Sequence, residues 1–508
     1  MKIGKHQTII LGPPGCGKTT TLLKMVEDAL LGGIKPEEIA FVSFTRKAVS
    51  EAADRACERF KFTRKRFPLF QTVHSLCFSR LGCGKQDLMS KQNYAELGSW
   101  LGYVFSTTVN LEDGLVSSGS EVGDKLLFLD NLARVQHKDI RTIWEEEGFD
   151  IQWPELERFS KGYAKYKENT GMMDFTDLLT KFVAEGRPTA AKVAFIDEAQ
   201  DLSKAQWLVL EKCFAQVDKV IIAGDDDQSI FKWSGADLQT FLNLKGEKRI
   251  LGVSHRLPKD IYNKAKNIIE QVKDRYDKPF EPTEAKGSVD YVSSLEQVTV
   301  KQGESTMVLV RNVYLLGQVY EHFKKLGLAY NGRNGFTSIG EGHVGAIRAW
   351  EAMRKGNCIP LPDARLIYEH LRVGKILARG GKVALDKHED TEEGITWETL
   401  RDHFGLLSKP LWHEALTGIP LEKREYYISL MRNKVKITAE PNVFINTIHG
   451  VKGGEAEHVI IVSDMSKRTY NEMQKDPDSE HRVAYVAMTR AKNRVTIVMP
   501  NSRYAYSY

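Results

Sequence analysis

Residues 8–19 read TIILGPPGCGKT, an apolar run followed by a glycine-rich turn that ends in Lys18 and Thr19. The run at 8–11 predicts a strand, and residues 20–31 continue in a helical pattern. In this context the glycines let backbone N–H groups close around the β- and γ-phosphates of a nucleotide. Lys18 supplies a positive charge there, and the Thr19 hydroxyl can bind Mg²⁺. The stretch therefore predicts a phosphate-binding loop, in preference to a glycine-rich turn without a nucleotide. The residues expected to bind the nucleotide are Gly12, Pro13, Pro14, Gly15, Cys16, Gly17, Lys18, Thr19 and Thr20.

Residues 195–201 read FIDEAQD and end a second apolar run with two adjacent carboxylates. Asp197 can hold the metal through water, and Glu198 can orient or deprotonate the attacking water. Taken alone, a strand that ends in acidic residues is typical of a solvated turn. Together with the loop at 12–19, the pair favours nucleotide hydrolysis, with Thr19 and Asp197 as the expected Mg²⁺ ligands.

Short β-branched runs alternate with helical patterns along most of the chain. Because several of these runs are apolar on both faces, they predict an α/β fold whose parallel sheets are covered on both sides. The runs form two groups, and each group is interrupted by a long charged segment, roughly 81–171 and 337–440. Two cores with one insertion each is the simplest interpretation.

Composition limits the possible classes of protein but does not identify the function. A chain of 508 residues is expected to form several domains, and a net charge of +5 permits a polyanionic partner without requiring one. The chain opens without the pattern of a signal peptide, and no apolar stretch reaches transmembrane length. The six cysteines are scattered, and only Cys77 and Cys83 lie near each other. We therefore expect a cytoplasmic protein that does not bind a membrane.

Residues 223–237 read AGDDDQSIFKWSGAD and resemble the third motif of UvrD/Rep-type superfamily 1 helicases. The resemblance implies that Gln228 senses the γ-phosphate and that Phe231 and Trp233 stack on DNA bases. Stacking of this kind tolerates any sequence because every base has a π-face, and it contributes about 1 to 3 kcal/mol per base. Ser234 stands where many relatives have an arginine, so a phosphate contact is expected either to be missing or to move to Lys232.

Other segments resemble further motifs of the family, and they follow in the family's order. In the first group, residues 42–48 resemble motif Ia and residues 72–75 resemble motif Ib, while residues 174–179 resemble the acidic stretch that follows the first insertion. Residues 254–256 resemble motif IV, whose arginine touches the γ-phosphate. The implied contacts are Phe44, Thr45, Thr72 and His74 with the DNA strand, and Arg46 and Arg256 with the nucleotide.

The second group continues the series. Residues 307–311 resemble the start of the second lobe, residues 445–455 resemble motif V, and residues 484–492 resemble motif VI. The resemblance implies that Arg490 is an arginine finger, which neutralises charge on the transferred phosphoryl group. It also implies that Thr447 and His449 contact DNA and that Gly454 and Glu455 contact the nucleotide.

The resemblance implies two RecA-like lobes with parallel sheets, each interrupted by a mostly helical or mixed insertion. The expected parts are a first lobe at 1–85 and 168–258, its insertion at 86–167, a second lobe at 259–338 and 438–508, and a shortened insertion at 339–437. The family's adenine-reading glutamine segment is expected to be missing, since only seven residues precede the first strand. A nuclease domain after motif VI is likewise not expected.

The implied function is an ATP- and Mg²⁺-dependent helicase or translocase that moves 3′ to 5′ on single-stranded DNA and acts at junctions with duplex DNA. RNA stays open as a substrate, because no motif visibly reads or rejects a 2′-hydroxyl. A second hypothesis is a DNA-stimulated ATPase that remodels proteins without separating strands. A small-molecule kinase or a transporter ATPase would not predict Phe231 and Trp233. The sequence does not identify protein partners or choose among replication, recombination and repair.

Two further sequence features can each be interpreted in two ways. Residues 61–67 read KFTRKRF, in which aromatic and basic side chains alternate between two DNA-facing motifs. This run fits nucleic-acid binding and a solvated face equally well. Tyr504, Tyr506 and Tyr508 alternate at the end of the chain, and they fit either a terminal strand or a stacking surface.

Overall fold

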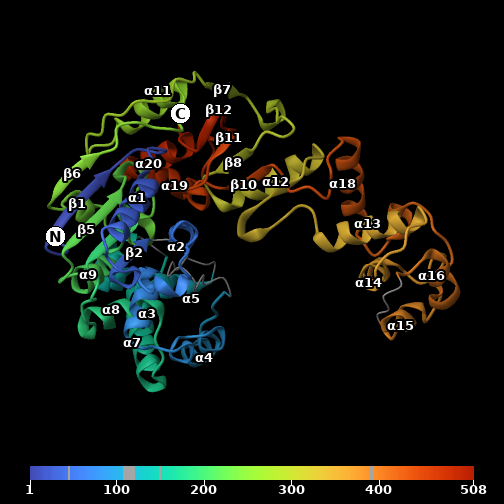
Figure 1. Ribbon diagram of the computed structural model, residues 1–508, viewed down its shortest axis with the longest axis horizontal. Coiled ribbons are helices and arrows are strands. Elements are labelled where there is room, and N and C mark those ends of the chain that lie inside the picture. Colours follow the sequence, from blue (N-terminus) through green and yellow to red (C-terminus); the bar gives the residue numbers. More distant parts are fainter. Residues whose placement is uncertain (44–45, 107–120, 148–149, 390–393) are drawn as a thin grey trace. The chain divides into compact units, whose positions relative to one another are not determined.

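A computed structural model of the chain describes residues 1–43, 46–106, 121–147, 150–389 and 394–508. The chain forms two compact units. The first unit contains Met1–Gly287 and Asn471–Thr489, and the second contains Ser288–Tyr470 and Arg490–Tyr508. The chain therefore passes between the units three times (Figure 1).

The first unit is built on a six-stranded sheet with the order β3-β2-β4-β5-β1-β6, in which every paired strand is parallel. Its strands are β1 (His6–Leu11), β2 (Ile39–Ser43), β3 (Phe70–Thr72), β4 (Val193–Asp197), β5 (Lys219–Gly224) and β6 (Glu247–Ile250). Strands β2 and β4 are buried at every position, as expected for a sheet covered on both faces.

Side chains that alternate along these strands enter two separate cores. Ile9 and Leu11 of β1 join the core on one face, whereas Ile10 joins the core on the other. Helices α1 (Lys18–Leu31) and α2 (Arg46–Phe60) cover the Ile10 face, and α3 (Val73–Arg80), α8 (Phe175–Glu185) and α9 (Lys204–Cys213) cover the opposite face. This period of two is the signature of a strand between two helical layers.

The first insertion is helical and has a core of its own, which includes Leu97, Leu129 and Phe159. Its helices are α4 (Lys91–Leu101), α5 (Val122–Gln136), α6 (Ile140–Glu147) and α7 (Trp153–Thr170). Helix α7 ends at Gly171, which adopts the left-handed conformation with φ of 68°. The Asp174 side chain then caps α8 by accepting a hydrogen bond from the backbone N–H of Asp177.

Three more helices complete the first unit: α10 (Leu238–Leu242), α11 (Lys259–Ile269) and α20 (Pro477–Met488). Helix α20 comes late in the chain but packs against α11, so the red helix lies among blue and green elements in Figure 1. The sequence interpretation placed both helices in the second lobe. The structure groups them with the first unit, and the lobe boundaries stay a prediction.

The second unit contains another six-stranded parallel sheet, in the order β7-β12-β11-β8-β10-β9. Its strands are β7 (Ser288–Val292), β8 (Thr306–Val310), β9 (Tyr330–Asn331), β10 (Val443–Thr447), β11 (Ala456–Val462) and β12 (Ala491–Val498). Helix α12 (Leu316–Lys325) buries Val319 and Phe323 against this sheet, and α19 (Lys467–Lys475) follows β11. The two parallel sheets with interspersed helices confirm the predicted α/β fold.

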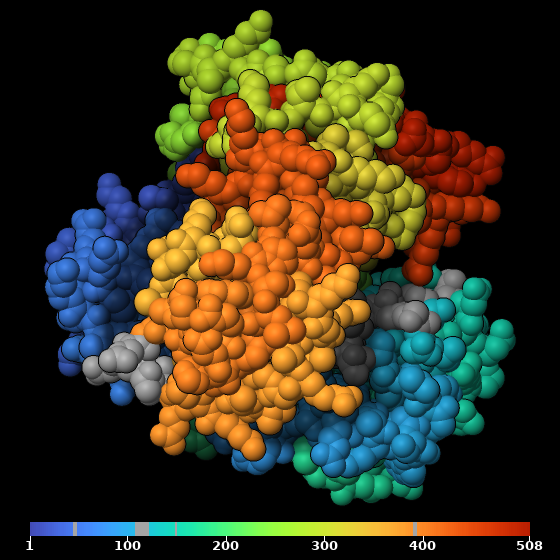
Figure 2. Space-filling model, turned by 90° about the vertical axis from the view of Figure 1, so that its right-hand side faces the viewer, coloured from blue at the N-terminus to red at the C-terminus, as the bar shows by residue number. Residues whose placement is uncertain are grey.

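The second insertion also has its own core, with Trp350, Tyr368 and Tyr427 fully buried in it. Its helices are α13 (Glu341–Arg354), α14 (Leu361–His370), α15 (Gly381–Asp386), α16 (Trp397–Phe404), α17 (Trp412–Ala415) and α18 (Leu421–Arg432). Figure 2 shows the surface that these helices form, in yellow to orange. Among all helices that the structure describes, none is both long enough and apolar enough to cross a membrane.

Candidate nucleotide and nucleic-acid site

The glycine-rich loop joins β1 to α1, as the sequence predicts, at the carboxyl edge of the first sheet. Gly15 and Gly17 both lie in the left-handed region, with φ of 74° and 79°. A Cβ atom on Gly15 would approach the Cβ of Arg256 to 2.4 Å, so a larger residue cannot occupy this position without displacing that arginine. The loop shape therefore depends on glycine, and ligands bind at this edge of open α/β sheets.

Lys18 is the first residue of α1, and its side chain lies over the loop. Its Nζ atom donates hydrogen bonds to the carbonyl oxygens of Gly12 and Pro13 at 2.8 and 3.4 Å. Burial opposes its charged form, but neighbours that include Asp225 and Asp197 raise the pKa of Lys18 above its ordinary value. The ammonium group is thus charged and placed where phosphate oxygens would enter the loop.

Thr19 and Asp197 meet beside the loop. The Thr19 hydroxyl donates to Asp197 Oδ2 at 2.8 Å, and Asp197 is the last residue of β4. Burial, followed by the charge of Glu198, raises the pKa of Asp197 to about 6. A hydroxyl and a carboxylate with uncompensated negative charge suit Mg²⁺, which prefers oxygen ligands.

The described ranges contain no group of three or more His, Cys, Asp or Glu side chains placed to hold a metal. Mg²⁺ does not need such a group, because it commonly takes one or two protein oxygens and completes its shell with water and phosphate oxygens. The residues present therefore fit a nucleotide-bound Mg²⁺ ion.

Glu198 adopts an unusual backbone conformation for a residue other than glycine, with φ of 52°. Its backbone N–H donates to Asp197 Oδ1 at 2.9 Å, and its Oε2 atom accepts from Gln200 Nε2 at 2.6 Å. Strained residues of this kind gather at functional sites, where the surrounding structure holds them in place. The turn thus holds the two neighbouring carboxylates in different surroundings, and their separate tasks stay a prediction.

Gln228 ends a short 3-10 helix, Asp226–Gln228, that follows β5. Its Nε2 atom donates to Asp225 Oδ2 at 2.6 Å, while the backbone N–H of Asp225 donates to Gln200 Oε1 at 2.9 Å. Gln200 therefore connects Glu198 to the Gln228 turn. The sequence interpretation did not assign Gln200, because a glutamine inside an acidic motif carries no signal of its own.

Arg256 belongs to a segment that is tied directly to the phosphate loop. The Ser254 hydroxyl donates to the carbonyl oxygen of Pro14 at 2.8 Å, and the His255 N–H donates to that of Gly15 at 2.9 Å. The first unit thus gathers the six predicted nucleotide-facing residues Lys18, Thr19, Asp197, Glu198, Gln228 and Arg256 at one edge of its sheet.

Arg490, Gly454 and Glu455 lie together in the second unit. The Arg490 side chain is only 1% exposed, and its Nη1 atom donates to the carbonyl oxygen of Gly454 at 3.4 Å. The Ala456 N–H, next to Glu455, donates to the carbonyl oxygen of Arg490 at 3.0 Å. The second unit therefore holds these three residues in one place, and their roles stay predictions.

Phe231 and Trp233 stand on the turn that continues from Gln228. Their ring centroids are 6.4 Å apart, and Trp233 is 40% exposed, which is unusual for such a large apolar side chain. Lys232 lies between them and forms an ion pair with Asp476 at 2.5 Å. An exposed tryptophan packed against a half-buried phenylalanine, with a lysine beside them, suits a single-stranded nucleic acid.

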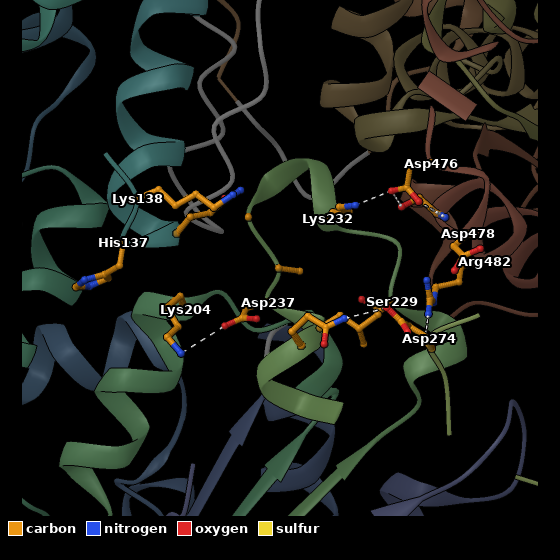
Figure 3. A pocket seen from close by; sticks show the side chains of 16 residues that line it. His137, Lys138, Lys204, Ser229, Lys232, Asp237, Asp274, Asp476, Asp478 and Arg482 are labelled. Atoms are coloured by element: carbon orange, nitrogen blue, oxygen red, sulfur yellow. Dashed lines mark hydrogen bonds and ion pairs between the residues drawn. The ribbon is translucent and has the colours of Figure 1, made fainter. Parts of the chain in front are cut away.

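Figure 3 shows a cavity of about 500 Å³ beside this turn, lined by residues of α5, α20 and the segment 235–239. Lys232 reaches across it to Asp476, and Lys204 lies 3.8 Å from Asp237 (Figure 3). Cations and carboxylates are mixed in its lining, so the cavity by itself indicates no particular ligand.

The other predicted DNA contacts lie at strand ends. Thr72 caps α3 by accepting a hydrogen bond from the Ser75 N–H at 3.3 Å, and His74 lies in the first turn of that helix. Burial lowers the pKa of His74 to about 4, so this ring is neutral near pH 7 and would contact a strand without adding charge. In the second unit, Thr447 ends β10 and His449 begins the 3-10 helix His449–Val451.

Three predicted residues cannot be placed in the site. Phe44 and Thr45 lie outside the described residues, and Arg46 begins α2 without a described side chain. In the basic run at 61–67, Arg64 pairs with Asp54 at 3.1 Å and Arg66 pairs with Glu37. These local ion pairs favour the interpretation of the run as a solvated face.

The structure also reveals two cations that sequence reasoning missed, Arg275 and Lys278, which pair with the aspartates of the third motif. The only sequence signal was the row of three aspartates at 225–227 at the end of a buried strand. Buried carboxylates need partners. The residues that supply those partners could not be found without the fold.

Two domain models of one family match the chain: the UvrD/REP helicase N-terminal domain over residues 1–249 and the UvrD-like helicase C-terminal domain over residues 421–502. The ATP-dependent DNA helicase PcrA of Staphylococcus epidermidis is 24% identical over 286 residues, which are 53% of this chain and 38% of the relative. PcrA of Staphylococcus aureus is 22% identical over 292 residues, which are 54% of this chain and 39% of the relative. The matches thus span about two fifths of the length of these curated relatives.

Proposed function

The chain belongs to the UvrD/Rep-type superfamily 1 helicase family, and from this premise we propose that it is an ATP-driven motor that moves along single-stranded DNA and unwinds duplex DNA. One observation supports the proposal best. Gln228, which donates a hydrogen bond to Asp225 just after β5, lies on one continuous turn with the half-buried Phe231 and the exposed Trp233. A change at the γ-phosphate would therefore move the same backbone that contacts the strand.

The proposed reaction is hydrolysis of ATP, in which the protein mainly positions groups and stabilises charge. Lys18 binds the β- and γ-phosphates, and Glu198 orients the attacking water and accepts its proton. Gln228 and Arg256 contact the γ-phosphate. Thr19 and Asp197 would hold Mg²⁺, which when bound neutralises charge on the phosphate oxygens.

We assign the arginine-finger role to Arg490, with Gly454 and Glu455 as further nucleotide contacts. A guanidinium group supplied at this point of phosphoryl transfer accelerates the reaction by about 10³- to 10⁵-fold in other nucleotide hydrolases. ATP bound by residues of both units would hold them together, and hydrolysis would release them. Alternation between the two states would move the protein along the strand.

The proposed strand contacts are Phe44, Thr45, Thr72, His74, Phe231, Lys232, Trp233, Thr447 and His449. The direction, 3′ to 5′, and the preference for junctions between single and duplex DNA follow from the family resemblance. The relatives named ATP-dependent DNA helicase PcrA are consistent with ATP and DNA as substrates. A cytoplasmic location stays a prediction.

The test measures ATP hydrolysis with and without single-stranded DNA, together with unwinding of duplexes that carry a 3′ or a 5′ overhang. We expect strong stimulation by the strand and unwinding from the 3′ overhang only. The variant Lys18→Ala should lose both activities, because it lacks the ammonium group that binds the phosphates. Lys24→Ala, a change six residues along the same helix, serves as the matched control.

Each other outcome has a distinct meaning. Stimulated hydrolysis without unwinding would favour the alternative, a DNA-stimulated ATPase that remodels or displaces proteins. Unwinding from the 5′ overhang would reverse the proposed direction. Hydrolysis that is indifferent to single-stranded DNA would contradict the motor itself.

A further inference from the structure

Three successive aspartates, Asp225, Asp226 and Asp227, are buried beneath the turn that carries Gln228. One ammonium group reaches all three. Lys278 Nζ lies 3.4 Å from Asp225 Oδ1 and 3.0 Å from Asp227 Oδ2, and it donates a hydrogen bond to Asp226 Oδ1. The Lys278 side chain is 1% exposed, so the cluster is shielded from solvent.

The carboxylates depend on a small number of cationic partners. Arg275 binds Asp227 with two hydrogen bonds, from Nε at 2.9 Å and from Nη2 at 2.8 Å. Lys278 forms the ion pairs with Asp225 and Asp226, and the Lys18 ammonium group also interacts electrostatically with Asp225. A buried charge that loses its partner is strongly destabilised, so the conformation of residues 225–227 depends on Lys278.

A chain of hydrogen bonds connects this cluster to the nucleotide site. The Oδ1 atom of Asp225 faces Lys278, and its Oδ2 atom accepts from Gln228 Nε2 at 2.6 Å. The backbone N–H of Asp225 donates to Gln200, whose amide in turn donates to Glu198. Asp225 thus links Lys278 to the γ-phosphate sensor and to the carboxylate that orients water.

A second connection fixes the segment that carries Lys278. Arg482 of α20 donates to the carbonyl oxygen of Asp226 at 3.0 Å and to that of Asp274 at 2.6 Å. The Tyr276 N–H donates to Asp226 Oδ2 at 2.8 Å. The segment 274–278, the aspartate turn and α20 are therefore joined by one connected set of hydrogen bonds within the first unit.

We propose that Lys278 is a positioning residue for ATP hydrolysis, which holds Asp225 and thereby keeps Gln228 in the orientation that makes hydrolysis respond to the bound strand. Lys278 touches neither nucleotide nor DNA in this role. The inference rests on the proposed function, since it assigns a residue that transmits the strand signal at the same site. It concerns the rate of hydrolysis, not the affinity for either ligand.

The test compares the double variant Asp226→Asn/Lys278→Met with wild type. The double change removes one negative and one positive charge together, so the net charge of the cluster stays the same, whereas Lys278→Met alone adds an uncompensated negative charge and risks unfolding. Lys266→Met on α11 is the matched control, because that lysine is exposed and forms a surface ion pair with Glu270 at 3.7 Å. The measurements are kcat and KM for ATP with and without oligo-dT, the Kd for oligo-dT, and the melting temperature.

We expect kcat in the presence of oligo-dT to fall by about tenfold to a hundredfold in the double variant, because a small displacement of a positioned group has effects of this size. KM for ATP, Kd for oligo-dT and the melting temperature should stay close to those of the control. Unchanged strand-stimulated kcat would overturn the positioning role alone. A parallel loss of kcat, strand affinity and melting temperature would assign Lys278 a purely structural role. Wild-type hydrolysis that oligo-dT does not stimulate would remove the proposed function and this inference together.

Discussion

The Thr19 hydroxyl gives a direct test of the metal site. It lies 2.8 Å from Asp197 Oδ2, where a hydroxyl and a carboxylate oxygen can bind Mg²⁺ together. We expect Thr19→Val, which keeps the shape of the side chain but removes this oxygen, to raise the Mg²⁺ concentration for half-maximal ATP hydrolysis by about tenfold. A Mg²⁺ titration at fixed ATP measures the shift. Thr19→Ser should titrate like wild type, and equal midpoints for the valine variant would exclude Thr19 as a ligand.

We expect His458 to make the stability of the second unit depend on pH. Its side chain is fully buried in β11, and its Nε2 atom lies 2.9 Å from Thr496 Oγ1. Burial, followed by the charge of Arg494, lowers the pKa of His458 to about 4, although Glu304 acts in the opposite direction. The unfolded chain binds a proton near pH 6.5, so stability is complete above that pH and is lost as the pH falls from 6.5 towards 4.

When the pH falls from 7 to 4.5, the free energy of unfolding should decrease by about 2 kcal/mol less in His458→Gln than in wild type. Urea unfolding at the two pH values measures the free energy of unfolding of each protein. His403→Gln, a change at an exposed histidine of α16, should keep the wild-type pH dependence. Identical slopes for wild type and His458→Gln would show that the ring is protonated in the folded protein as readily as in the unfolded chain.

At the scale of elements, the junction between the first insertion and the core depends on the start of α8. Asp174 caps this helix, and it also binds Arg134 of α5 at 2.6 Å and Lys167 of α7 at 3.0 Å. Burial acts against the carboxylate, but Arg134 and Lys167 hold the pKa of Asp174 far below its ordinary value. One side chain therefore joins three helices.

Removal of the Asp174 side chain should destabilise the folded protein. We expect Asp174→Ala to lower the free energy of unfolding by about 3 kcal/mol, because it leaves two cations with fewer partners in a buried place. Chemical unfolding of the full chain measures the change. Asp54→Ala, which breaks an exposed pair with Arg64 at 3.1 Å, should have little effect. If both variants lost a comparable free energy of unfolding, burial would not be the reason that the Asp174 ion pairs stabilise the protein.

Sequence patterns predicted the elements whose signals are local. The strand at 8–11, the phosphate loop and the acidic end of β4 were found because strand periodicity and glycine spacing are visible within a few residues. The partners of the aspartates were not found, because Arg275 and Lys278 meet them only in the folded chain. The residues of helix α20 were assigned to the second lobe because residues 484–492 resemble motif VI of that lobe, whereas in the folded chain the helix packs on α11.

At the scale of the whole molecule, the second insertion has a hydrophobic core that is separate from that of its sheet. We expect Trp350→Ala, which empties a fully buried site at a cost of about 3 to 5 kcal/mol, to loosen this insertion without abolishing basal ATP hydrolysis. Limited proteolysis with mass spectrometry should then show new cuts confined to residues 340–432. Loss of basal hydrolysis along with those cuts would show that the insertion and the nucleotide site fold as one unit.

The three passages of the chain between its units impose an order on biosynthesis. The first unit contains Asn471–Thr489, so it lacks α20 until translation has passed residue 488. At about 5 to 20 residues per second, the ribosome needs roughly 10 to 40 seconds to extend the nascent chain from Gly287 to Thr489. During that interval the face of α11 that α20 will cover is open to chaperones. A ribosome-bound chain that stops before residue 471 should therefore expose this face, and a chain released from the ribosome with α20 included should not.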